Sequence, residues 1–241
     1  MSIMSTQLPK NSIVARYFYL GMALLIVVIS VYGFGQTIDT NLIHPSSARP
    51  FILYAHAAVF SAWLIFFVLQ TAWVRAGHVR WHRNIGWFGV VLGITIPLLG
   101  VSTAIAMSHF HLTHLSRQQV ENDLIIPLCD MTAFTAIFSL AVLWRKKLDF
   151  HRRLMLMATC VLTSPAFGRF PPVIMPNYAF YVGVDVLILL GVIHDLHMNR
   201  RVHKAYAYGL PVLMIGQMLV MRINLHGVAG WSFLAGFILG F

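Results

Sequence analysis

The chain of 241 residues consists largely of apolar runs, each long enough to cross a bilayer and separated by short polar turns. Residues 51–74, for example, contain no Asp, Glu, Lys or Arg. A soluble domain carries about 25% charged residues, whereas here only 10% of the residues are charged and 59% are hydrophobic. Too few charges are available to cover a water-exposed surface, so the sequence predicts an all-α membrane protein.

The apolar runs predict seven transmembrane helices in a single integral membrane domain, residues 1–241. They are expected at 17–36, 51–75, 85–108, 124–144, 153–175, 178–196 and 206–224. Pro165, Pro171 and Pro172 fall within the fifth helix and are expected to kink it. The apolar tail 227–241 spans only about 22 Å as a helix, less than the roughly 30 Å core. It is expected to form a packed or interfacial half-helix, with an eighth crossing as the alternative.

The basic residues predict the orientation of these helices. Of the 17 Lys and Arg residues, four lie on one side: Arg49, Arg117, Arg169 and Arg222. The other thirteen are Lys10, Arg16, Arg75, Arg80, Arg83, Arg145, Lys146, Lys147, Arg152, Arg153, Arg200, Arg201 and Lys204. Basic loops stay in the cytoplasm, so the N-terminus is predicted inside and the C-terminus outside. The net charge of +10 therefore reflects membrane orientation, and no nucleic-acid partner is expected.

Three helix pairs share one weak pattern. Each has a polar residue near the outer end of the first helix, a basic cytoplasmic turn and a histidine where the second helix begins. The polar residues are His56, Asp130 and Asp185, and the turns contain His82-Arg83, His151-Arg152 and His203-Lys204. The spacings differ between the pairs, so this repeat indicates three hairpins (helices 2–3, 4–5 and 6–7) without requiring a common origin.

The residues around these turns resemble a known family. YAHAAVF around His56, WHRNIGW at 81–87 and FHRRLMLMA at 150–158, followed by Arg169, are similar to the DUF2306 family of bacterial predicted membrane proteins. The resemblance covers residues 51–175. It implies a multi-pass protein of the bacterial inner membrane, and it implies no particular activity.

Five ionisable residues from five predicted helices fall at one depth. Helical rise places His56, Asp130 and Asp185 about 8–10 Å below the outer boundary, and Arg169 and Arg222 about 24 Å above the inner one. This predicts a polar layer in the outer third of the bundle. Charged groups at such depths usually pair with one another or serve a function.

The layer allows several interpretations. Two Asp–Arg ion pairs with His56 beside them would be structural, as in an accessory subunit or a transporter. His56, Asp130 and Asp185 could instead bind a metal such as zinc and form a metal-dependent enzyme, although the two arginines oppose a cation. A proton relay would use the same groups. A haem or quinone pocket would use His56 together with Arg169 or Arg222.

Other histidines give weaker indications of a site. His82 and His151 lie at the membrane edge within basic turns, where contacts with lipid phosphates account for them. A haem held by two of the cytoplasmic histidines would need both on facing helices. His194 and His197, with Asp195, and the outer group His109, His111 and His114 are possible metal ligands. The leading hypothesis is a redox membrane protein with a haem or quinone pocket, with a second membrane protein as a possible partner.

Overall fold

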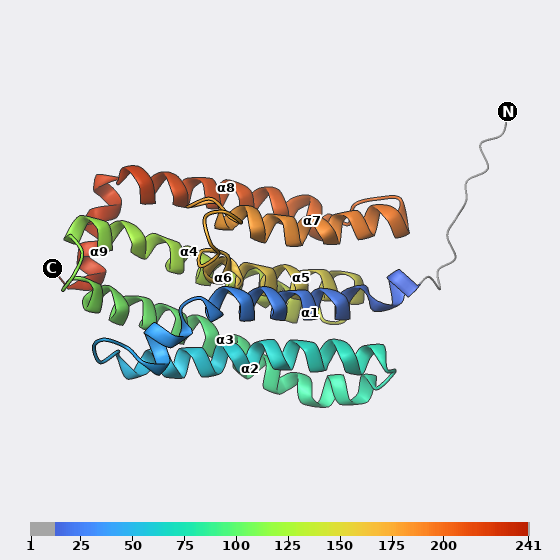
Figure 1. Cartoon of the computed structure of the whole chain (residues 1–241). Helices are drawn as coiled ribbons and strands as arrows, with labels where there is room; N and C mark the ends of the chain where they lie inside the picture. Colours follow the sequence, from blue (N-terminus) through green and yellow to red (C-terminus); the bar gives the residue numbers. More distant parts are fainter. Residues whose placement is uncertain (1–12, 241) are drawn as a thin grey trace.

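The computed structural model describes residues 13–240, all of which belong to helices or connections. Lys10, part of the predicted cytoplasmic charge, lies outside the described residues. The helices, shown in Figure 1, are α1 (Ile13–Gly35), α2 (Phe51–Arg75), α3 (Val79–His111), α4 (Arg117–Leu143), α5 (Leu148–Val161), α6 (Ser164–Phe167), α7 (Phe180–Asn199), α8 (Lys204–His226) and α9 (Ala229–Leu239), with a π-helical turn at Asp39–Ile43.

Within the described residues, six helices are long and apolar enough to cross a membrane: α1, α2, α3, α4, α7 and α8. They correspond to six of the seven predicted spans and indicate a multi-pass membrane protein. The observed α3 and α4 are longer than predicted, and α2 has the predicted bounds. The predicted count of seven spans is not confirmed, because the segment 153–175 is not one continuous helix.

The chain leaves the helical path after Val161 because of its prolines. Pro165 has no backbone N–H to donate to Val161, and its ring disfavours a continuing α-helix. The chain makes a turn at Thr163, whose hydroxyl donates to the Cys160 carbonyl at 2.6 Å, and then forms the four-residue helix α6. Pro171 and Pro172 follow in the irregular segment that leads to α7. The prolines therefore end the predicted fifth helix instead of kinking it, and α5 has only 14 residues.

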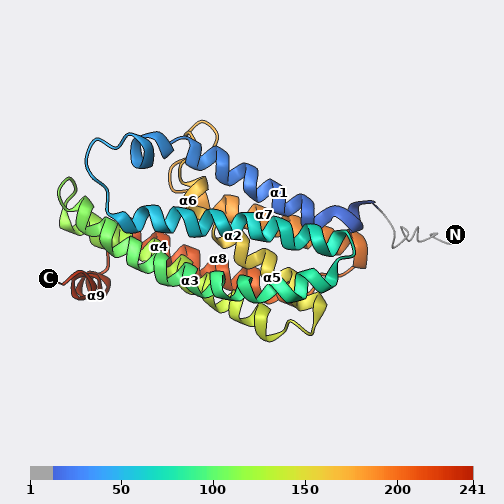
Figure 2. The same cartoon turned by 90° about the horizontal axis from the view of Figure 1, so that it is seen from below.

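The connections α2–α3, α4–α5 and α7–α8 lie at one end of the bundle (Figures 1 and 2), and together with the adjoining helix ends they contain most of the basic residues. The α3–α4 connection and α9 lie at the opposite end. There α9 crosses the bundle nearly at right angles and packs against α3 and α4. The 11 residues of α9 agree with the predicted half-helix, since about 16 Å of helix is too short to cross the bilayer core.

The core of the bundle surrounds α4. Phe134 of α4 is fully buried, Phe138 stacks on it, and Trp63 of α2 packs edge-on against both rings. Gly93 of α3 allows Phe138 to lie close to the α3 backbone, since a Cβ at this glycine would come within 2.2 Å of the ring. Helix α4 is therefore the element against which the others are positioned.

A buried ion pair joins α5 to α7. Arg153 contacts both carboxylate oxygens of Asp195, through Nε at 2.7 Å and Nη2 at 2.5 Å. The two side chains are 2% and 1% exposed. The third guanidinium nitrogen, Nη1, donates to the Asp149 carbonyl at 2.8 Å. The sequence predicts Arg153 on the basic, cytoplasmic side and Asp195 only as a possible metal ligand, so it does not predict this pair.

Removing one partner of this pair should destabilise the protein strongly, because the remaining charge would be buried and unpaired. We expect Asp195→Ala or Arg153→Met to lower the free energy of unfolding by about 3–5 kcal/mol. Replacing both together, as Arg153→Met with Asp195→Leu, should cost less than either single change. The measurement is denaturant unfolding in detergent, followed by circular dichroism.

The neighbouring Arg152 provides a matched control. It pairs with Asp149 at 2.5 Å at the surface, and such exposed pairs contribute at most about 1 kcal/mol. If Arg152→Met and Arg153→Met lowered the free energy of unfolding equally, the buried pair would have no special role in stability.

Candidate functional site

Asp130 is held by two hydroxyl groups where the helical path is broken. It lies on α4 and is buried, with 5% of its surface exposed. One carboxylate oxygen accepts a hydrogen bond from Ser164, the first residue of α6, and the other accepts one from the Tyr181 hydroxyl at 2.9 Å. Tyr181 is in the first turn of α7. The carboxyl group therefore connects α4 to both ends of the irregular segment between α6 and α7.

The partners of Asp130 are neutral, which differs from the expected Asp–Arg pair. Among the ion pairs of the described residues, none joins Asp130 or Asp185 to Arg169 or Arg222. A buried carboxyl group satisfied by hydroxyl groups can exist in both its ionised and its protonated form, since a hydroxyl can donate to it or accept from it.

Arg169 forms a second polar group just beyond α6. Its Nε donates to the Thr37 hydroxyl at 3.0 Å and its Nη1 to the Pro165 carbonyl at 2.6 Å. The guanidinium carbon lies 4.7 Å from the centre of the Phe34 ring. No hydrogen bond joins Nη2 to another described residue, so this nitrogen is available as a donor.

His56 of α2 belongs to the same group. Its ring stacks on Phe60 with the ring centres 4.0 Å apart, and it interacts electrostatically with Arg169. Its Nδ1 is buried without a hydrogen-bond partner. His56 and Arg169 thus offer unused polar atoms beside the Phe34 and Phe60 rings, and we name these four residues the Arg169 cluster.

Helix α6 connects the Arg169 cluster to Asp130. Ser164 at its start contacts Asp130, and the Pro165 carbonyl in its first turn accepts from Arg169. Helix α1 packs directly on this short helix at Gly33, where a Cβ would lie 2.3 Å from the Ala166 carbonyl oxygen. The position of α6 therefore depends on close contact with the α1 backbone.

The other two members of the predicted layer lie elsewhere. Asp185 of α7 is half-buried; its Oδ1 has no hydrogen-bond partner, and Gln217 of α8 is its side-chain neighbour. Arg222 is exposed on α8, beside a cavity that it lines with residues 226–228. Within the described residues no three His, Cys, Asp or Glu side chains form a group that could hold a metal, so the proposed ligands His56, Asp130 and Asp185 do not come together.

The histidines predicted on the cytoplasmic side make contacts with protein. The His82 and His151 rings lie 6.2 Å apart, and His151 Nδ1 bonds to the Ala141 carbonyl at 2.8 Å. His194 stacks on Phe18 at 3.9 Å between ring centres. Arg83 of the predicted basic turn is exposed. In the outer group, His111 and His114 both lie edge-on to the Phe110 ring.

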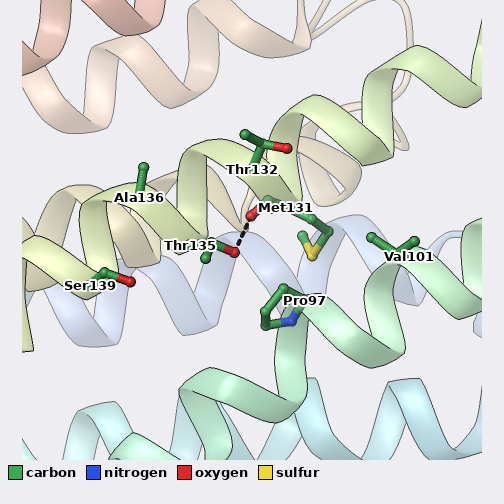
Figure 3. A pocket seen from close by; sticks show the side chains of 7 residues that line it. All are labelled: Pro97, Val101, Met131, Thr132, Thr135, Ala136 and Ser139. Carbon is green, nitrogen blue, oxygen red and sulfur yellow. Dashed lines mark hydrogen bonds between the residues drawn. The ribbon is translucent and has the colours of Figure 1, made fainter.

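A groove of about 350 Å³ between α3 and α4 contains none of the predicted site residues (Figure 3). It is lined by Pro97, Val101, Met131, Thr132, Thr135, Ala136 and Ser139. Its threonine hydroxyls donate to their own helix, Thr132 to the Leu128 carbonyl and Thr135 to the Met131 carbonyl. The groove therefore offers few free polar atoms, and the Arg169 cluster is the stronger candidate site.

His56, Asp130 and Arg169 of this site are predicted from the sequence, whereas Ser164 and Tyr181 are not. Ser164 precedes Pro165 within the predicted fifth helix, and Tyr181 lies one helical turn before Asp185. The three prolines at 165, 171 and 172 are the sequence signal for the end of the helix after Val161, because a single proline is enough to kink a helix and three within eight residues favour its termination.

We expect Gly33→Ala to destabilise the protein by about 1–3 kcal/mol, because the added methyl meets backbone atoms that cannot move aside as a side chain could. Thermal unfolding in detergent measures the loss. Gly21→Ala is the matched control on the same helix, since no atom lies within 4 Å of a Cβ there, and it should be neutral. Similar unfolding of both variants would argue against close packing of α1 on α6.

The comparisons with known proteins give no family: no family model, no curated protein and no solved structure matches this chain. The resemblance to the DUF2306 family stays a prediction.

Proposed function

We propose that this chain is a quinone-linked redox membrane protein that binds the quinone ring at the Arg169 cluster. The observation that carries the proposal is that two neighbouring residues of α6 contact two kinds of group. Ser164 contacts the buried carboxyl group of Asp130, which can hold a proton, and the Pro165 carbonyl contacts Arg169, which has a free N–H donor. A quinone needs both kinds of group, since its carbonyl oxygens accept hydrogen bonds and its reduction to the quinol consumes two protons. The two electrons would come from the second membrane protein that is expected as a partner. We further propose a bacterial inner-membrane location with the basic turns in the cytoplasm, in line with their clustering at one end (Figure 1).

Different residues of the site would bind the quinone ring and hold the proton. Arg169, through Nη2, would donate to a carbonyl oxygen of the ligand. His56 already has a hydrogen bond with the Leu99 backbone, so its unpartnered Nδ1 would accept from the hydroxyl of the reduced quinol. The Phe34 and Phe60 rings offer apolar faces for a flat ring. Asp130 would hold the proton, with Ser164 and Tyr181 stabilising either form of the carboxyl group.

Haem and zinc fit these residues less well than a quinone. A bis-histidine haem needs two facing histidines, whereas His56 faces Phe60 and an arginine. A zinc site needs three or four ligands, and the described residues contain no such group. The arginine that opposes a cation favours a carbonyl oxygen instead.

The proposal predicts tight binding of a short-chain quinone, decylubiquinone, to the purified protein in nanodiscs. Loss of the charged donor in Arg169→Gln should raise the Kd about tenfold, and His56→Phe should raise it by a smaller factor. Quenching of tryptophan fluorescence measures binding. Asp130→Asn should leave the Kd within about twofold, because Asp130 holds the proton and not the ring.

Arg222→Gln is the matched control, since Arg222 belongs to the same predicted layer but lies on the exposed face of α8. It should bind the quinone like the wild type. The proposal would be wrong if the wild type bound no quinone, or if Arg169→Gln and Arg222→Gln weakened binding equally while both proteins stayed folded.

A transporter is the second candidate, favoured by the break between α5 and α7. Broken helices form the substrate sites of many transporters, because non-helical backbone at membrane depth is tolerated where it is buried in protein or lines a cavity. A transporter must expose its site to both sides in turn. In a variant without Cys129 and Cys160, Ser164→Cys should then react with an impermeant maleimide from either side of the membrane. Labelling from one side only, or from neither, contradicts transport.

A further inference from the structure

Two basic side chains at the end of α8 line a cavity. Arg222 and His226 are four residues apart, so they lie on one face of the helix, and both are exposed. With Gly227 and Val228 they border a space of about 480 Å³. The residues that line it lie where α8 joins α9, at the end of the bundle away from the basic turns (Figures 1 and 2).

Within residues 13–240, no ion pair joins Arg222 or His226 to an acidic side chain. Of the acidic groups on the first turns of α4, Glu121 pairs with Arg117 at 2.6 Å, and Asp123 accepts from the Asn224 amide at 2.9 Å. The side chains next to Gly227 are the neutral amides of Asn122 and Gln118. A positive charge beside an apolar surface and without a counterion in the protein is free to bind an external anion.

The face of α8 below Arg222 is apolar and exposed. Tyr208, Val212, Ile215 and Leu219 follow at helical spacing, and each has more than half of its surface exposed. Arg222 and His226 continue the same row. From Val212 to Arg222 the helix rises about 15 Å, roughly the hydrocarbon depth of one leaflet. The row thus offers an apolar surface on which acyl chains can pack, with a cationic group at the level of the lipid headgroups.

Helix α9 lies at that same level. The Trp231 indole donates to the Glu121 carbonyl at 2.7 Å and ties α9 to α4. Phe233 and Phe237, one turn apart, are 81% and 77% exposed. A short apolar helix that lies across the bundle end with exposed phenylalanines is typical of an element in the membrane interface.

We propose that Arg222 and His226 bind the phosphate of an anionic membrane phospholipid, whose acyl chains lie along the exposed face of α8 and against the phenylalanines of α9. The guanidinium supplies paired N–H donors to phosphate oxygens, and His226 adds a second donor. This lipid site is separate from the Arg169 cluster, and it does not depend on the quinone proposal.

The test is native mass spectrometry of delipidated protein, titrated with phosphatidylglycerol. The wild type should bind one molecule tightly. Arg222→Gln should weaken binding about tenfold, Arg222→Lys less, and Phe233→Ser with Phe237→Ser should also weaken it. Arg169→Gln, the control for loss of one arginine, should bind like the wild type. Circular dichroism establishes that each variant is folded, as expected for changes at the exposed positions 222, 233 and 237.

Inorganic phosphate separates a lipid site from a simple anion site. Millimolar phosphate should not displace the lipid, because it gains nothing from the apolar face of α8. The proposal fails if phosphate alone competes fully, if the phenylalanine variant binds as tightly as the wild type, or if Arg222→Gln and Arg169→Gln lose affinity equally.

Discussion

The structure depends most on the need to satisfy backbone polar groups where the helical path stops within an apolar bundle. After Val161 the chain turns, forms four residues of helix and then runs irregularly to Phe180. No water is available in a bilayer core to bond such backbone groups, so neighbouring protein groups must do so. The Thr163 hydroxyl bonds the Cys160 carbonyl, the Thr163 carbonyl accepts from the Ala166 and Phe167 amides, and Arg169 bonds the Pro165 carbonyl.

This requirement draws the polar residues of the bundle to α6. Ser164 reaches Asp130 on α4, Arg169 reaches Thr37 beyond α1, and α1 approaches through Gly33. The hydrogen bonds that stabilise the break therefore also build the candidate site. Such a binding site adds little to the free-energy cost of burying polar groups, because these groups are already buried to satisfy the backbone at this point.

The start of α5, away from α6, is fixed by a separate contact. This contact is the Arg153–Asp195 pair, in which both charges are buried and each carboxylate oxygen accepts a hydrogen bond from an N–H of Arg153. A buried pair of this kind adds little net stability compared with apolar residues, but it disfavours other rotations of α5 against α7, because any other rotation would leave a charge unpaired. The same bundle thus has a charged contact near the basic turns and a hydroxyl–carboxyl contact near its middle.

The sequence by itself determined the helical, multi-pass character of the protein, because hydrophobic length and the scarcity of charge are local properties. It also predicts His56, Asp130 and Arg169 at one depth from helical rise, but the height of Arg169 assumes a continuous helix through residue 169, whereas α5 ends at Val161. It did not determine which residues of that layer meet. Arg222 lies on the exposed face of α8, Asp130 bonds to Ser164 and Tyr181, and Arg153 is buried with Asp195. Those contacts depend on helix rotation and on where α5 ends, and both are decided by the packing of side chains between helices, which only the tertiary structure contains.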